Sequence, residues 1–200
     1  MTMIVSENTV PDFLFQRLQR DVMSMDLSWY YANQTTYGNF DHEETENTLY
    51  QHSYFHSVIV EGNHNSPVAS LVEMCIAGIF DKAGIEFKGR IDRARFITQI
   101  VGPTSITHKP HIDTADVKYT GFMYINDSDG DSVMYNENYD IMSGMNSFEY
   151  YKLLDQKGFT VRETIEPRAN KSVLFDSMIY HSSCSPSKTS RRVVLNFSAE

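Results

Sequence analysis

Two histidines and one aspartate in this sequence have the residue types and the spacing of a metal site. His111 and Asp113 flank Ile112, and residues two apart on a β-strand point to the same face of a sheet. His181, far along the chain, can complete the set. Two imidazoles and one carboxylate occupy one face of an octahedral iron site and leave three adjacent positions open for a bidentate cosubstrate and dioxygen. The pattern therefore favours oxidation over hydrolysis.

The second half of the chain must supply the strands that position these side chains. From residue 93 onward, short segments rich in β-branched and aromatic residues alternate with polar turns. This pattern predicts a mainly β fold, an antiparallel sandwich or jelly roll in which metal ligands on neighbouring strands converge. The expected strands cover residues 93–101, 109–113, 119–126, 132–136, 159–166, 172–176, 180–184 and 191–198.

Helices are expected before the strands. Leu14, Leu18, Val22 and Met25 recur at helical spacing, directly after a proline and an aspartate that favour a helix start. A second helix is predicted from about 66 to 84, with its apolar positions on one face and a glycine at its end. Both helices are interpreted as packing against the sheet.

A single domain is expected over residues 1–200, with an N-terminal helical support at 1–90 and the β core at 91–200. Residues 138–158 form an insertion between two expected strands, in which Ser147 could cap a short helix. Long insertions between strands are often functional. The segment is interpreted either as a lid over the substrate or as a surface elaboration packed on the sheet.

Composition narrows the class of protein. The formal net charge of -9 opposes a surface that tracks phosphates, so nucleic acid is disfavoured as a partner. The apolar run at 74–80 is too short to span a bilayer, and no signal-peptide pattern is present. Cys75 and Cys184 are too few for a disulfide framework. A soluble, cytoplasmic protein is expected, and its oligomeric state is left open.

Six short motifs follow one another through residues 90–198. They are His108-Lys109-Pro110-His111-Ile112-Asp113, Tyr124-Ile125-Asn126, Asp129-Gly130-Asp131, Lys171-Ser172-Val173-Leu174-Phe175-Asp176, His181 and Arg192-Val193-Val194-Leu195-Asn196. In this order they resemble the 2-oxoglutarate and Fe(II)-dependent oxygenases, in particular the prolyl 4-hydroxylase-like branch and its small phage-type members. The resemblance implies a double-stranded β-helix core, with a jelly-roll or cupin-like topology and N-terminal helices packed on the sheet.

The resemblance also implies roles for individual side chains. His111, Asp113 and His181 would hold Fe(II). A basic residue about ten positions after the second histidine would bind the far carboxylate of 2-oxoglutarate, and both Arg191 and Arg192 stand there.

Strand alternation separates the two arginines. If Arg192 faces inward, so do Val194 and Asn196, and Arg191 lies on the other face as a solvated residue. The family pattern of a basic residue followed three positions later by an aliphatic one matches Arg192 and Leu195. A guanidinium can bind a carboxylate through two hydrogen bonds and stays charged. Arg192 is therefore the predicted cosubstrate residue, and an additional contact from Arg191 is left open.

Tyr124 stands where the family often places a tyrosine whose hydroxyl donates to the same carboxylate. It is the second predicted cosubstrate residue, and the alternative is a core tyrosine with a hydrogen-bonded hydroxyl. Asp131 departs from the family, because many relatives carry a second glycine there. The departure leaves the metal ligands untouched, but it bears on the local strand geometry and on any substrate class inferred from the family.

The implied activity is that of a dioxygenase. With O2 it would decarboxylate 2-oxoglutarate to succinate and hydroxylate an unactivated C–H bond. Hydroxylation is favoured because Asp113 fills the position that is vacant in halogenating relatives, while demethylation stays open. A prolyl or other amino-acid residue is the favoured substrate, with a small molecule as the alternative. The rival interpretations are a non-catalytic metal-binding β-sandwich (cupin-like) protein and an enzyme that uses the same ligands without 2-oxoglutarate.

Two further metal sites are not favoured. Residues 127–131 resemble a calcium loop, but the glycine is one position early, and a hairpin turn is the preferred interpretation. His108 and His111 would face opposite sides of a strand, so His108 is expected at the surface or as a support of the ligand set. His52 and His56 lie in a stretch interpreted as loop or strand, which gives no second metal site.

Overall fold

The computed structural model describes residues 2–24, 26–32 and 53–200, and within these ranges the protein is mainly β with three α-helices. The helices are α1 (Asp12–Met23), α2 (Ala69–Ala83) and α3 (Ser147–Lys157), and a 3-10 turn covers Ile141–Ser143. The strands are β1 (Met3–Ser6), β2 (Tyr30–Ala32), β3 (Ser53–Val60), β4 (Asn63–His64), β5 (Ile91–Ile100), β6 (Tyr119–Tyr124), β7 (Ser132–Asn138), β8 (Val161–Ile165), β9 (Ser172–Asp176), β10 (Ile179–Ser183) and β11 (Arg191–Ala199).

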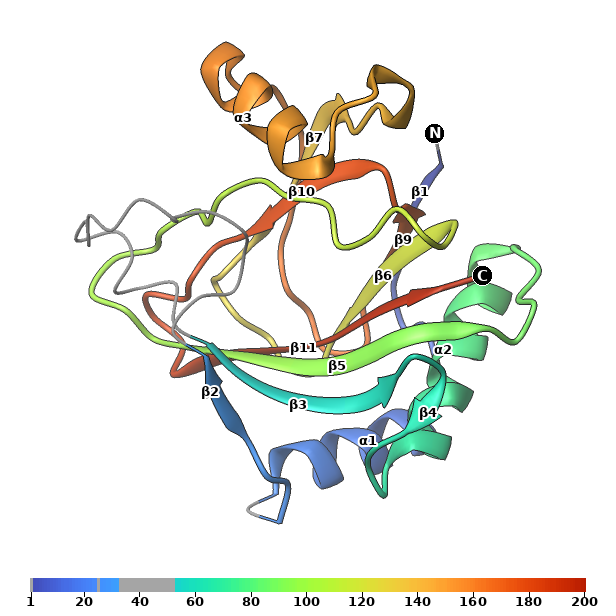
Figure 1. Cartoon of the computed structure of the whole chain (residues 1–200). Coiled ribbons are helices and arrows are strands. Elements are labelled where there is room, and N and C mark those ends of the chain that lie inside the picture. The colour runs from blue at the N-terminus through green and yellow to red at the C-terminus, as the bar shows by residue number, and fades with distance from the viewer. Residues whose placement is uncertain (1, 25, 33–52) are drawn as a thin grey trace.

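The strands form two facing sheets. The larger sheet has the order β1-β9-β6-β11-β5-β3-β2, with β4 added to β3, and the smaller sheet has the order β10-β7-β8. All of these pairs are antiparallel. In Figure 1, α1 and α2 lie on the outer side of the larger sheet, and α3 lies over the smaller one. This arrangement is a double-stranded β-helix with flanking helices, so the predicted fold class is confirmed.

One expected strand is wrong. Residues 109–113 do not form a strand, and only His111 makes an isolated antiparallel bridge, to His181. Pro110 has no backbone N–H and cannot donate a ladder hydrogen bond, which explains why the pairing is interrupted between the bridges of Thr107 and His111. The metal ligands in this segment are therefore positioned by a connection and not by a regular strand.

The N-terminal part contains more than helices. It also supplies β1, which pairs with β9, and β3, which pairs with β5 and extends the larger sheet. Both predicted helices are present, and Gly84 ends α2 in the left-handed conformation with φ 67°. Met25 and His52 lie outside the described residues.

The insertion between β7 and β8 carries α3, whose N-terminal cap differs from the prediction. Asn146, one residue before Ser147, accepts a hydrogen bond from the Glu149 backbone N–H, and Glu149 bonds back to the Asn146 N–H. This reciprocal capping box satisfies two amide groups that a helix start leaves open. Gly158 ends the helix, and its backbone N–H group donates to the Leu154 carbonyl oxygen.

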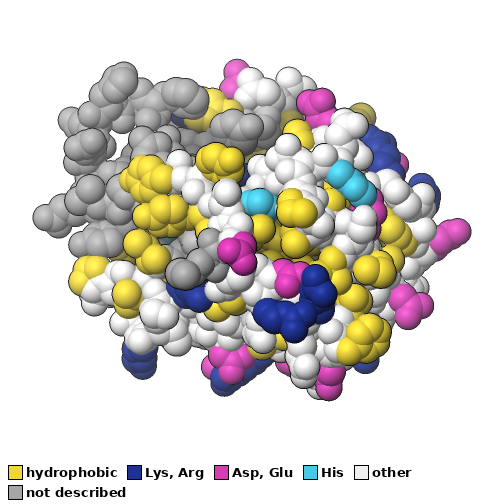
Figure 2. All heavy atoms as spheres, turned by 90° about the horizontal axis from the view of Figure 1, so that it is seen from below, with side chains coloured by type: hydrophobic (Ala, Val, Ile, Leu, Met, Phe, Trp, Pro, Cys, Tyr) yellow, Lys and Arg dark blue, Asp and Glu magenta, His cyan; other side chains and the backbone are white. Residues whose placement is uncertain are grey.

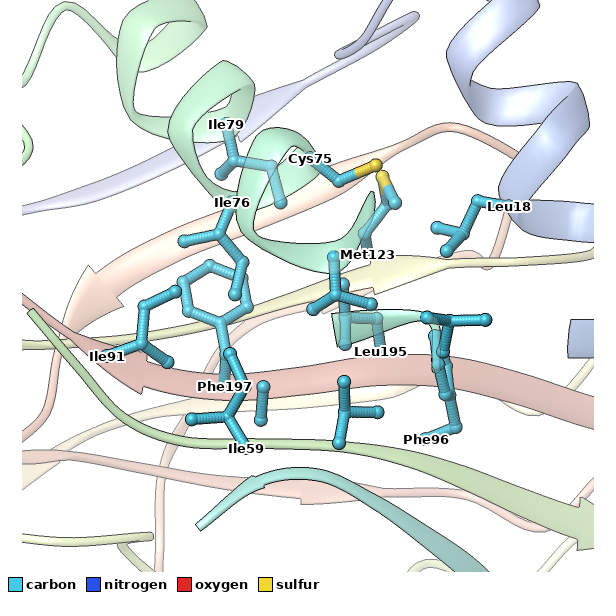
Figure 3. Packing of buried hydrophobic residues seen from close by; sticks show 14 of the residues in the cluster. Leu18, Ile59, Cys75, Ile76, Ile79, Ile91, Phe96, Met123, Leu195 and Phe197 are labelled. Carbon is cyan, nitrogen blue, oxygen red and sulfur yellow. The ribbon is translucent and has the colours of Figure 1, made fainter. Parts of the chain in front are cut away.

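The main core lies between the larger sheet and the two N-terminal helices. Ile76 and Ile79 of α2 and Leu18 of α1 pack on side chains from the sheet (Figure 3). The sheet residues include Phe96, Met123, Leu195 and Phe197. Each such side chain contributes about 1.5–3 kcal/mol when it is fully buried. Because side chains alternate along a strand, the neighbours of these core residues must face the smaller sheet.

The described residues show no broad basic area on the face seen from below in Figure 2. Among the described residues there, the lysine and arginine side chains form small groups beside acidic and hydrophobic ones. Arg17 of α1 is paired with Asp21 at an N–O distance of 2.7 Å. Within the described ranges, no helix has the length and apolar character needed to cross a membrane.

The close contact between β6 and β11 gives a test of the packing. Gly121 is opposite Phe197, and a Cβ atom at Gly121 would lie only 2.3 Å from the phenyl ring. Overpacking of this kind costs about 1–3 kcal/mol. We expect Gly121→Ala to lower the free energy of unfolding by this amount in urea denaturation. In a Phe197→Leu background the same change should cost less, and an equal cost in both backgrounds would contradict the contact.

Candidate active site

The three predicted metal ligands converge between the two sheets. His181 lies on β10, and His111 is held beside it by two backbone hydrogen bonds of 2.9 and 3.0 Å. The ligand atoms of these histidines and of Asp113 all lie within 4.8 Å of one another. His181 Nε2 is 3.5 Å from the nearer carboxylate oxygen of Asp113, and His111 Nε2 is 4.0 Å from the other. The three side chains could hold one metal ion together.

Both imidazoles keep their Nε2 atoms available. His111 Nδ1 lies 3.1 Å from the Lys109 carbonyl oxygen, and His181 Nδ1 lies 3.2 Å from the Ile179 carbonyl oxygen. A carbonyl oxygen can only accept, so each Nδ1 carries a proton, and in the neutral ring Nε2 then keeps its lone pair. Burial, together with His181, lowers the pKa of His111 to about 3, which keeps this ring neutral. In their neutral forms both rings would have the tautomer that a metal ion needs.

Asp113 is ionised and surrounded by cations. Its buried carboxylate lies 3.1 Å from a guanidinium nitrogen of Arg93 and 3.8 Å from one of Arg95, both on β5. Burial raises the pKa of Asp113, but His181, Arg93 and His111 outweigh it and hold the pKa well below its usual range. The sequence reasoning missed both arginines. Arg93 and Arg95 are two residues apart on β5, so side-chain alternation predicts that they share a face. Only the folded structure shows that this face lies beside Asp113.

Asn196 fixes the orientation of the Asp113 carboxylate. Its side-chain N–H group donates to Oδ2 of Asp113 at 2.9 Å. The sequence predicts that Asn196 faces inward, but it assigns no role to this residue. A group that orients a metal ligand in this way commonly changes metal affinity by 10- to 100-fold in other proteins.

Arg192 lies on the wall of the same cavity, and its side chain faces inward as predicted. It is 3% exposed, and it donates to Gln99 Oε1 at 3.2 Å and to Ser132 Oγ at 2.7 Å. Its Nε atom is buried and has no hydrogen-bond partner within the described ranges. Arg191 is exposed on the other face of β11. A buried positive charge with unused hydrogen-bonding capacity therefore faces the cavity.

The cavity joins the metal ligands to Arg192. It has an empty volume of about 550 Å³, which includes space open to solvent, and it is lined by His111, Asp113, His181 and Arg192. Ile97, Phe122 and Val194 add apolar walls. This arrangement offers metal ligands and a separate cationic group to one small molecule, which suits an elongated dicarboxylate.

The structure places Tyr124 behind the cavity wall. Its side chain is fully buried, and its hydroxyl donates to Ser132 Oγ at 2.8 Å, with the Ile165 carbonyl oxygen at 3.3 Å. Its ring lies under the Arg192 guanidinium, with 5.4 Å between the guanidinium carbon and the ring centroid. Ser132, which the sequence reasoning missed, lines the cavity in its place. The geometry favours the alternative interpretation of Tyr124 as a core tyrosine, one that contacts two residues of the cavity wall.

His108 supports Arg192 through an intermediate side chain. It is buried, and its Nδ1 atom accepts from the Gln99 side-chain N–H group at 3.1 Å, while Nε2 lies 2.8 Å from Ser185 Oγ. Gln99 in turn accepts from Arg192 and lies opposite it in the β5–β11 register. His108 was expected either at the surface or as a supporting residue, and the structure shows it buried and bonded to Gln99.

The acidic turn at 127–131 has a structural role. The Asp129 carboxylate accepts backbone hydrogen bonds from Ser187 and Thr189, each from 2.9 to 3.0 Å. A Cβ atom at Gly130 would lie 2.5 Å from the Cys184 carbonyl oxygen and 3.0 Å from Arg192 Cδ. The turn therefore fixes the loop before β11, and glycine is required where the loop passes beside Arg192.

Comparison with known proteins shows likeness in structure but none in sequence. The sequence matches no family model and no curated protein. A 2OG-Fe(II) oxygenase family oxidoreductase from Burkholderia pseudomallei has a TM-score of 0.64 and 11% identity, over 98% of this chain and 84% of that one. A Trichoplax adhaerens prolyl hydroxylase in complex with a hypoxia inducible factor peptide fragment has a TM-score of 0.57 and 12% identity, over 98% and 82%.

A third similar structure is HygX from Streptomyces hygroscopicus, with nickel, 2-oxoglutarate and hygromycin B bound. Its TM-score is 0.53 and its identity 9%, over 98% of this chain and 82% of that one. At such identities the likeness establishes the fold only. The expected closeness to small phage-type members stays a prediction. The structural neighbours of this chain are thus 2-oxoglutarate and iron-dependent oxygenases, and the chain shares their double-stranded β-helix fold.

Proposed function

We propose that this protein is an Fe(II)- and 2-oxoglutarate-dependent dioxygenase that hydroxylates an unactivated C–H bond. The observation that carries the proposal is one cavity lined by both the His111, Asp113 and His181 set and the buried Arg192. A metal-binding protein without this chemistry has no need for a buried cation beside its metal site, because burying a charge is costly. The shared fold supports the same assignment.

The residues present fit Fe(II). Nε2 of His111, Nε2 of His181 and a carboxylate oxygen of Asp113 are the donor set that iron oxygenases use. Iron, bound together with 2-oxoglutarate, would activate O2, so that one oxygen atom enters succinate as carbon dioxide is released and the other hydroxylates the substrate.

The protein's own groups hold and orient the reactants. Asn196 fixes the Asp113 carboxylate before any ligand binds. Arg192 would bind the far carboxylate of 2-oxoglutarate, because a guanidinium remains charged inside a cavity and can donate two parallel hydrogen bonds. Ile97 and Phe122 restrict water on the remaining walls.

Ser132 would complete the carboxylate site. Its Oγ atom accepts from both the Tyr124 hydroxyl and an Arg192 N–H group, at 2.8 and 2.7 Å. A serine hydroxyl has two acceptor lone pairs and one proton, so its own proton is left to donate into the cavity. Tyr124 would then act on the cosubstrate through Ser132, as a positioning residue.

The substrate we propose is a prolyl or other amino-acid residue, or a small molecule with a comparable group. The structurally similar proteins support both, since one holds a peptide fragment and another hygromycin B.

The metal site is tested by removing its ligands. His111→Ala and His181→Ala should each abolish stoichiometric Fe(II) binding and leave the fold largely intact, because both side chains line a cavity. Anaerobic competition with a chromogenic chelator measures the binding, and circular dichroism checks the fold. His64→Ala is the matched control, since His64 is exposed and pairs with Glu73 on the surface. Unchanged Fe(II) affinity in either ligand variant would overturn the assignment.

The role of Arg192 is tested by anaerobic titration of the Fe(II)-loaded protein with 2-oxoglutarate. A weak visible absorption band should appear and saturate at one equivalent. Arg192→Ala should raise the apparent Kd about 10- to 100-fold, the loss expected for hydrogen bonds to a charged group. Arg192→Lys should be intermediate because lysine offers only a point charge. Arg191→Ala is the control, and an unchanged Kd in Arg192→Ala would refute the role.

Ser132 and Tyr124 can be separated in the same titration. Ser132→Ala should raise the Kd for 2-oxoglutarate about three- to tenfold, through loss of one direct hydrogen bond. Ser132→Thr should restore most of the affinity, since it keeps the hydroxyl. Tyr124→Phe should have a smaller effect than Ser132→Ala, with Fe(II) binding unchanged in all three. The reverse order would show that Tyr124 contacts the cosubstrate directly.

A further inference from the structure

A second cavity lies beside the metal ligands, on the side of α3. The figure of the whole chain shows α3 over the smaller sheet, above β7 and β10 (Figure 1). The cavity has an empty volume of about 320 Å³, part of it open to solvent. We call it the tyrosine cavity, and it is lined by His111, Ile112, Ser147, Phe148, Tyr151 and Tyr180. It therefore connects a metal ligand to the insertion between β7 and β8.

Two of these residues carry buried hydroxyl groups without a partner. Tyr151 is 8% exposed and Tyr180 is 1% exposed. Neither hydroxyl oxygen has a hydrogen-bond partner among the residues that the structure describes. The nearby hydroxyls of Tyr124 and Tyr135 are also buried, but they are bonded to Ser132 and Ser182 at 2.8 and 2.9 Å. Buried tyrosine hydroxyls are normally paired, so two unpaired ones in a single cavity point to a ligand.

The chemistry of the cavity limits what that ligand can be. Burial raises the pKa of Tyr151 to about 12 and raises that of Tyr180 further, so both hydroxyls remain protonated donors. None of the described residues that line the cavity is Lys, Arg, Asp or Glu. A charged ligand would therefore lose its hydration without gaining an ion pair. An uncharged acceptor oxygen would satisfy the two donors.

The walls are largely apolar. Both tyrosine rings pack near the Phe159 ring, whose centroid is 5.3 Å from that of Tyr180 and 6.2 Å from that of Tyr151. Phe148 and Ile112 complete the apolar surface, and Ser147 lies exposed at the edge. Such walls fit a compact apolar body.

We propose that the tyrosine cavity binds the primary substrate through an uncharged group, a compact apolar body that carries a hydrogen-bond acceptor oxygen such as an amide carbonyl. Tyr151 and Tyr180 are the specificity-determining donors. The insertion at 138–158 is thereby part of the substrate site, since Ser147, Phe148 and Tyr151 all come from α3. That the ligand is the substrate rests on the proposed oxygenase function, whereas the predicted binding of a neutral amide does not.

The binding is tested with metal-free protein and N-acetylpyrrolidine, a neutral amide on a compact ring. Cyclopentanecarboxylate and pyrrolidinium serve as charged probes of similar size. Saturation-transfer NMR titrations should show that the amide binds more tightly than either ion. Tyr151→Phe and Tyr180→Phe should each weaken amide binding about three- to tenfold, the effect of one neutral hydrogen bond. Tyr30→Phe is the control, because Tyr30 is exposed on β2 and does not line the cavity.

The Tm of each variant, measured by thermal unfolding, separates a loss of binding from a loss of stability. Removing an unpaired hydroxyl should leave Tm unchanged or raise it, so a lowered Tm in both phenylalanine variants would show that the hydroxyls have partners and would overturn the proposal. No saturable amide binding, equal affinity in all variants or preference for an ion would overturn it as well. Since no iron or 2-oxoglutarate is present, these outcomes leave the visible-band titration untouched, and failure of that titration refutes only the oxygenase function.

Discussion

The alternation of side chains along β11 couples the core to the candidate site. Leu195 and Phe197 pack in the core with the N-terminal helices. This packing fixes which face of β11 is turned to the helices, and with it the register of β11 between β5 and β6. The residues of the alternate set on β11, Arg192, Val194 and Asn196, then have to face the smaller sheet. A shift of β11 by one residue would bury the wrong side chains on both faces at once. Hydrophobic packing thus sets the position of the cationic and metal-orienting groups.

The interior between the sheets carries an excess of positive charge. Arg192, Arg93 and Arg95 face or border this region, and Asp113 is the carboxylate among them. A bound divalent cation would increase the imbalance, and desolvated like charges repel strongly. A dianionic cosubstrate would offset the two positive charges that the metal ion adds. The electrostatics therefore favour binding of the metal ion and 2-oxoglutarate together over binding of the metal ion alone.

Sequence reasoning reached the features that depend on local pattern. The strand at 172–176 and the inward face of β11 follow from alternation, and α1 follows from helical spacing. Short strands such as β1, with four residues, carry too little pattern, and β1 finds its partner only at the other end of the chain. Arg93 and Ser132 were missed for a similar reason. Alternation assigns a side chain to a face, whereas its neighbours across the cavity depend on how the two sheets close.

The connection between β5 and β6 also covers the free edge of the smaller sheet. It makes two isolated bridges there, from His111 to His181 on β10 and from Thr107 to Cys184 just after β10, and Pro110 lies between the two bridges. An interrupted edge of this kind does not offer another chain a continuous ladder. At the last bridge and two residues beyond it, the side chains of His111 and Asp113 lie beside His181. A bound metal ion would cross-link the connection to β10. The stability of this sheet edge would then depend on metal supply.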